Sequence, residues 1–148
     1  MPIFAAAFLA LPVFASAHAA GFVIEPIGQP GEVAGCVAIN AETEVGLVAV
    51  DQTLVLIMTS ELLRLRKGDA VDGTWQVDNS KERRLDVKTD TVNTVSVELP
   101  ASKENFALLA NGNTVTVTMG ATSVEWGLDG SRKALVDLGT CMDKNAKR

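Results

Sequence analysis

The sequence has very few of the side chains that usually carry acid–base and metal chemistry in proteins. Its 148 residues include one histidine, two cysteines and no tyrosine. The single histidine, His18, lies in or beside an apolar N-terminal stretch. A Ser-His-Asp or Cys-His catalytic arrangement is therefore not available in the rest of the chain, and neither is a His-based metal site. We predict no catalytic residue, no bound metal and no cofactor.

Glycine and proline are not enriched and positive charge is in deficit, and each of these facts excludes a class of protein. Twelve Gly and five Pro exclude a collagen-like or low-complexity chain, and 47% hydrophobic residues exclude a disordered one. Lys and Arg number 13 against 18 Asp and Glu, which gives a net charge of −5. A chain with this balance is a poor candidate for nucleic-acid binding or for adhesion to an anionic membrane surface. The length is typical of one compact domain.

The N-terminal segment has the pattern of an export signal. Residues 1–20 carry no Asp, Glu, Lys or Arg, and an apolar run over 3–14 precedes two overlapping Ala-x-Ala patterns within 15–19. The run is too short to span a membrane comfortably. We predict a signal peptide over 1–20 and one periplasmic or secreted domain over 21–148. A buried N-terminal helix is the alternative, but Pro12 and the alanine-rich end favour a leader.

The two cysteines are far apart in the sequence. In an exported protein, a minimal even pair such as Cys36 and Cys141 predicts one disulfide, although two separate thiols remain an alternative. Their spacing excludes a local redox motif, and without a supporting histidine they make a poor zinc site. The bond would join the first strand of the domain to its last helix.

Alternation of apolar and polar residues predicts a mostly antiparallel β-rich domain. We expect an α+β fold of seven or eight strands, a sandwich or a partly open barrel, with two short helices. The expected strands are 34–40, 45–50, 54–59, 71–77, 84–88, 94–99, 114–119 and one holding Val124 and Trp126. Segment 21–33 reads as an irregular lead-in, and 60–67 is ambiguous between strand and helix. The strands 45–50 and 54–59 are apolar on both faces, so we expect them at the centre of a sheet.

Capping residues and apolar spacing locate the two helices. Ser102 is the expected N-cap of a helix over 103–110, and Asp129 or Ser131 that of the final helix. Ala134, Leu138 and Cys141 recur at helical spacing, which directs Cys141 at the body of the protein. The disulfide is therefore expected to link the C-terminal helix covalently to the sheet. Trp75 and Trp126 fall on inward strand positions, so we expect both in the core.

Two groups of charged residues are candidates for binding. The carboxylates of Asp69, Asp72 and Asp78 permit a hard-cation site or a glycosidase pair, but turn chemistry explains them more simply. Two short basic groups can form a surface for an anionic partner, such as lipopolysaccharide or a carboxylate-rich protein. A solvated face, balanced by nearby acidic residues, is the alternative. The basic residues of this candidate binding surface are Arg64, Arg66, Lys67, Arg83 and Arg84.

Two stretches resemble small exported proteins of alphaproteobacteria. These are 65–78, which reads LRKGDAVDGTWQVD, and 126–135, which reads WGLDGSRKAL and continues to Leu138 and Cys141. The chain resembles the invasion-associated locus B type in these stretches and in the order of its elements. The resemblance implies an exported, β-rich envelope protein, and it offers no catalytic motif to transfer.

The sequence thus favours a non-enzymatic, exported protein that binds a protein or an envelope component, with a possible role in virulence. We expect no nucleic-acid partner and no integral membrane span. The alternatives are an inhibitor of an envelope-acting enzyme, a carboxylate-dependent hydrolase, and a structural role through self-association.

Overall fold

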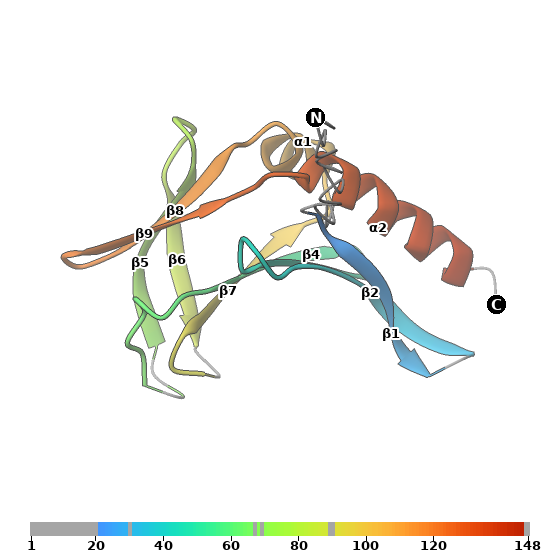
Figure 1. The fold of residues 1–148 in the computed structure, drawn as a ribbon, viewed down its shortest axis with the longest axis horizontal. Coiled ribbons are helices and arrows are strands. Elements are labelled where there is room, and N and C mark those ends of the chain that lie inside the picture. Colours follow the sequence, from blue (N-terminus) through green and yellow to red (C-terminus); the bar gives the residue numbers. More distant parts are fainter. Residues whose placement is uncertain (1–20, 30, 67, 69, 89–90, 147–148) are drawn as a thin grey trace, which may run out of the picture.

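The computed structural model describes residues 21–29, 31–66, 68, 70–88 and 91–146. These residues form nine strands and two helices (Figure 1). In chain order the elements are β1 (Val23–Gln29), β2 (Glu32–Asn40), β3 (Val45–Val50), β4 (Thr53–Thr59), β5 (Ala70–Val77), β6 (Arg83–Lys88), β7 (Thr94–Pro100), α1 (Lys103–Ala110), β8 (Thr114–Met119), β9 (Thr122–Gly127) and α2 (Ser131–Ala146).

The strands pair into two sheets that do not close into a barrel. One sheet has five strands in the order β1-β2-β3-β4-β7, and the other has four in the order β6-β5-β8-β9. Each pairing is antiparallel. Helix α2 lies along the β1–β2 side of the larger sheet and packs on β1, β2 and β3 (Figure 1). The predicted β-rich α+β fold with mostly antiparallel strands and two helices is confirmed.

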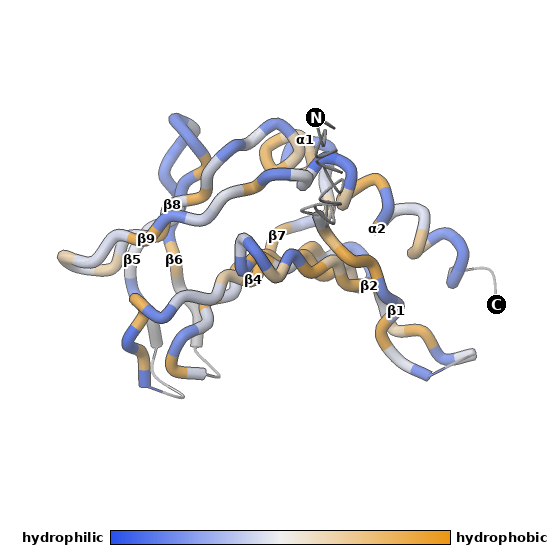
Figure 2. Tube along the Cα trace, viewed as in Figure 1, coloured by the Kyte–Doolittle hydropathy of each residue, from blue (hydrophilic) through white to orange (hydrophobic). Residues whose placement is uncertain are grey.

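The core lies between one face of the five-stranded sheet and a layer made by the other sheet and the helices. Hydrophobic residues concentrate along the larger sheet, as Figure 2 shows. On β4, Leu54, Leu56 and Met58 are fully buried, because they alternate onto the inner face. Trp75 and Trp126 are also in the core, as predicted. The indole Nε1 of Trp126 donates to the carbonyl of Thr59 at 2.8 Å and so ties the two sheets together.

The N-terminal part of the domain differs from the prediction. Segment 21–33 is not an irregular lead-in, because β1 occupies most of it and β2 begins at Glu32. Pro26 is tolerated because β1 is an edge strand, and Gly28, with φ +114°, lies where the β1–β2 register shifts. The domain therefore has one strand more than expected, and Cys36 lies on the second strand rather than the first.

The central hairpin and the first helix are as predicted. Strand β3 is the middle strand of its sheet and joins β4 through Asp51 and Gln52. Ser102 is the N-cap of α1, and its hydroxyl accepts a hydrogen bond from the Asn105 amide at 3.2 Å. The ambiguous segment 60–67 forms neither helix nor strand over its described residues.

The predicted cap of the last helix is wrong. The carbonyl of Gly130 accepts the first helical hydrogen bond of α2, from the Ala134 amide, so Ser131 already lies inside the helix. The Ser131 hydroxyl instead donates to the carbonyl of Leu109 at 2.6 Å. A side chain expected to cap one helix thus joins two helices.

Candidate binding surfaces

A disulfide joins Cys36 on β2 to Cys141 on α2, as predicted. The two Cα atoms are 6.3 Å apart, and the residues are 105 positions apart in the sequence. Cys36 points to the inner face of the sheet and is fully buried. Ala134 and Leu138, which share a helical face with Cys141, are also buried. The bond therefore fastens the inner face of α2 to the core side of the larger sheet.

The structure separates the two arginines of β6. Arg83 and Arg84 are neighbours in a strand, so their side chains point to opposite faces of the smaller sheet. The guanidinium of Arg83 lies 5.3 Å from the centroid of the Trp75 ring and donates to Asn105 Oδ1 at 3.1 Å. Arg83 thus covers a core tryptophan and contacts α1, whereas Arg84 is exposed.

The other basic residues of the candidate surface belong to the segment between β4 and β5. Arg64 and Arg66 are exposed there. Lys67 lies outside the described residues. The same segment is joined to the start of β7 by a hydrogen bond from the Leu65 amide to the Val92 carbonyl at 2.8 Å.

The acidic residues noted in the sequence do not form a common site over the described residues. Asp69 is outside them, and Asp72 is exposed on β5. Asp78 follows β5 in a turn, where its carboxylate accepts the amides of Asn113 and Thr114, each at 3.0 Å. Its role is thus that of a turn residue. Within the described ranges, no group of three His, Cys, Asp or Glu residues is placed to hold a metal ion.

The outer face of the five-stranded sheet is a large apolar surface that neither helix nor the second sheet covers. Side chains on β2, β3 and β4 that alternate away from the core are partly or mostly exposed. Ile39 is 52% exposed and Val23, its partner across β1 and β2, is 63% exposed. We call this surface the sheet trough and define it by Val37, Ile39, Gly46, Val48, Val55 and Ile57.

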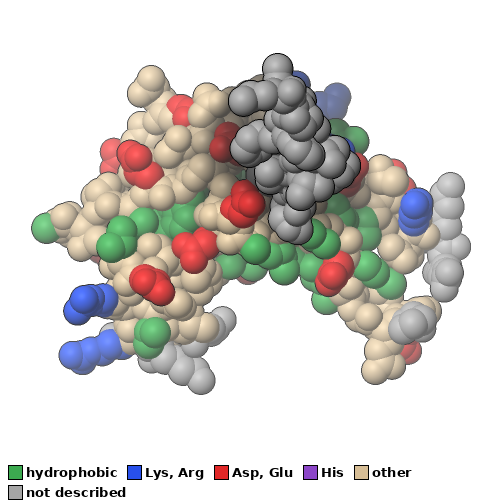
Figure 3. Space-filling model, viewed as in Figure 1, with side chains coloured by type: hydrophobic (Ala, Val, Ile, Leu, Met, Phe, Trp, Pro, Cys, Tyr) green, Lys and Arg blue, Asp and Glu red, His purple; other side chains and the backbone are tan. Residues whose placement is uncertain are grey.

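Part of the sheet trough could be anticipated from the sequence. Val48, Val55 and Ile57 make β3 and β4 apolar on both faces, a pattern that predicts a central position in the sheet. The central position of these strands is confirmed, but only the inner face is covered. Figure 3 shows the surface hollowed beneath this sheet, with hydrophobic side chains gathered along the hollow.

Other grooves lie elsewhere on the surface, two of them beside α2. One, of about 330 Å³, lies between the helices and is lined by Phe106, Arg132, Leu135 and Val136 among others. Another, of about 150 Å³, lies beside α2 and is lined by Val33, Met142 and Asn145 among others. The first is at the lower end of the size range of ligand pockets, and the second is below it. No helix among the described residues is long and apolar enough to cross a membrane.

The fold defines a class of small β-rich proteins with two open antiparallel sheets and a disulfide-linked C-terminal helix. Among solved structures, the chain is similar to the crystal structure of invasion associated protein B from Bartonella henselae. The TM-score is 0.55 at 17% sequence identity, over 83% of this chain and 93% of that chain. The resemblance seen in the sequence is thereby confirmed for the fold. No family model matches the chain, and no curated protein matches it.

Proposed function

We propose that the chain is an exported, non-enzymatic protein that binds a protein partner at the cell envelope. The apolar leader pattern over 1–20 supports export, and the disulfide is compatible with an oxidising compartment. The similar solved structure is that of a protein described as invasion associated, which favours an envelope role with a link to virulence.

The sheet trough is the observation that carries the binding part of this proposal. Contiguous apolar patches on the surface of soluble proteins often mark interaction sites. Here the exposed Ile39 and the half-buried Val37, Val48, Val55 and Ile57 lie on three adjacent strands. Rigid strands hold these side chains in place, so a partner can dock without an ordering cost on this side.

The basic residues are proposed as a second contact region for anionic groups of the partner or of the envelope. Arg64, Arg66, Lys67 and Arg84 are the members we assign to this contact. We assign Arg83 a supporting role, because its guanidinium already lies over Trp75 and contacts Asn105. Such a contact should weaken with added salt, because exposed charges are screened.

Export is tested by fractionating cells that express the full-length chain with a C-terminal tag. We expect periplasmic or secreted protein that has lost about 20 residues and has no titratable thiol. Recovery of cytosolic protein with an intact leader would contradict export.

Binding is tested by site-specific photo-crosslinking in the same cells. A photo-reactive residue at Val55 lies in the sheet trough, and one at Val136, which is 64% exposed on α2, is the matched control. We expect a discrete crosslinked product from position 55 that is absent from position 136. The same products from both positions, or none from position 55, would contradict a docking role for this face.

A further inference from the structure

We propose that the sheet trough binds an amphipathic helix that carries a Lys or Arg at each end of its apolar stripe. The inference rests on the proposed function, because it concerns the same face, and it adds the chemistry of the partner. Three features of the described residues support it: the order of side chains across the sheet, the shape of the surface and the position of two carboxylates.

The order of side chains follows from the strand register. Across the five strands, partner residues form one row on the outer face: Glu25, Val37, Val48, Val55 and Glu98. Three valines therefore occupy the middle of the row, and one glutamate lies at each end. Four strand spacings of about 4.8 Å separate the two glutamates, a distance of about 19 Å. A helix covers that distance in about 13 residues.

The neighbouring row has its smallest residue, a glycine, at its centre. There, Gly46 lies between Ile39 and Ile57, its partners on β2 and β4. A Cβ atom at Gly46 would lie 3.6 Å from the Ile57 Cβ and 3.7 Å from the Ala38 carbonyl oxygen, which is ordinary contact. Crowding at the Cβ position therefore does not require glycine here, although Gly46 is buried, and a larger side chain would add bulk between the two isoleucines. The larger sheet arches in Figure 1, and Figure 3 shows the surface hollowed beneath it.

The charges at the two ends of the row distinguish between the partners that could bind in the sheet trough. Glu25 and Glu98 are exposed, and neither has a cationic partner among the described residues. A second copy packed face to face would bring carboxylates against carboxylates, because both ends of the row are acidic, and like charges across an interface are unfavourable. A helix with cationic ends places opposite charges at both positions while its apolar stripe covers the valines.

The test uses two synthetic helical peptides of 15 residues and the purified, oxidised protein. Both peptides carry the same apolar stripe of leucine and alanine. One peptide has two lysines at each end, and the other has two glutamates at each end. Fluorescence anisotropy should show the lysine peptide binding at least tenfold more tightly. Amide chemical-shift changes should map to β2, β3 and β4.

Variants of the protein separate charge from shape. The double variant E25Q/E98Q should weaken binding of the lysine peptide about three- to tenfold and remove most of the preference between the peptides. E125Q, at an exposed position on β9, should leave both affinities unchanged. Gly46→Ala, whose added Cβ would make only ordinary contacts, should narrow the space between the isoleucines and weaken binding while the melting temperature stays near that of the wild type.

Several outcomes would overturn the inference. They are equal binding of the two peptides, shifts confined to other elements, and an E25Q/E98Q variant that keeps the full preference. Concentration-dependent dimers whose shifts map to the trough would show a second copy as the occupant instead. If position 55 crosslinks a partner in cells while neither peptide binds, the helix proposal fails and the proposed binding function stands.

Discussion

Asp78 shows how one side chain can hold a connection between distant parts of the chain. Its backbone has φ +47°, a region that residues other than glycine seldom adopt. The carboxylate accepts two backbone amides at the start of β8, and the Asp78 amide donates to the Thr114 carbonyl at 2.9 Å. The residue thus fixes the turn after β5 against β8, its neighbour in the sheet.

Replacing Asp78 by alanine should lower the free energy of unfolding by about 1–2 kcal/mol, because two hydrogen bonds to a charged acceptor are lost. Asp51 offers a matched control: it has φ +50° and makes no side-chain hydrogen bond within the described part of the chain. Urea unfolding of D78A and D51A measures the difference. Equal losses in both variants would show that the backbone conformation, and not the two hydrogen bonds, explains the effect.

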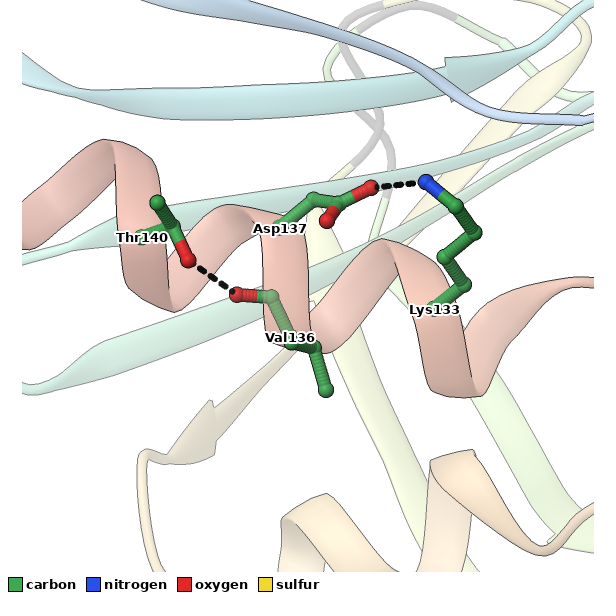
Figure 4. A network of polar contacts seen from close by, with 4 residues as sticks. All are labelled: Lys133, Val136, Asp137 and Thr140. Carbon is green, nitrogen blue, oxygen red and sulfur yellow. Dashed lines mark hydrogen bonds and ion pairs between the residues drawn. The ribbon is translucent and has the colours of Figure 1, made fainter.

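At the scale of elements, a buried hydroxyl joins the two helices, and at the surface the Arg132 guanidinium of α2 also donates to the side-chain oxygen of Asn111, the C-cap of α1. Ser131 is 1% exposed and donates to Leu109, the last buried residue of α1. On the outer side of α2, Lys133 and Asp137 form an ion pair at 2.6 Å, and Thr140 Oγ1 donates to the Val136 carbonyl at 3.2 Å (Figure 4). These outer contacts are solvent-exposed, and such contacts contribute little.

Ser131→Ala should therefore cost about 1–2 kcal/mol of unfolding free energy, because a buried carbonyl loses its donor. Thr140→Ala removes a hydroxyl that also donates to a carbonyl, but at an exposed site, and should change stability by less than about 0.5 kcal/mol. Thermal and urea unfolding of the two variants test this contrast. A T140A loss as large as that of S131A would argue against burial as the cause.

The elements also show which parts of the fold the sequence could predict. Continuous apolar runs located β3 and β4, and alternation located β7 and β8, because neighbouring side chains of a strand point to opposite faces. It missed β1, because Pro26 and Gly28 signal a loop unless the strand is known to lie at an edge with a bulge. Edge position depends on pairing with distant strands, which local sequence does not specify.

The candidate site shows a similar limit. Cys36 and Cys141 could be paired from the sequence, because there were only two cysteines to pair. The outer apolar face could not be recognised, because apolar side chains at successive positions of β3 and β4 indicate burial without saying which layer covers which face. That Arg83 and Arg84 point to opposite faces follows from alternation once both are placed in one strand. The contact of Arg83 with Asn105 joins β6 to α1, and it could not be predicted without knowing how these two elements pack.

At the scale of the whole molecule, the disulfide is the largest single constraint on the unfolded chain. It closes a loop between residues 105 positions apart, for which the chain-entropy model gives about 4–5 kcal/mol. Replacing both cysteines by alanine should lower the free energy of unfolding by about 3–5 kcal/mol. Wild-type protein in reductant should unfold like the double variant, and an unchanged urea midpoint in both would contradict this role of the bond.

The same bond spans almost all of the domain, from the second strand to the middle of the last helix. A protease that cuts one exposed connection between the two cysteines would leave both pieces covalently attached. Such a nicked molecule would keep its full mass on a non-reducing gel and would separate into two bands only after reduction. For a protein working among extracellular proteases, one cut in such a connection would not release either half.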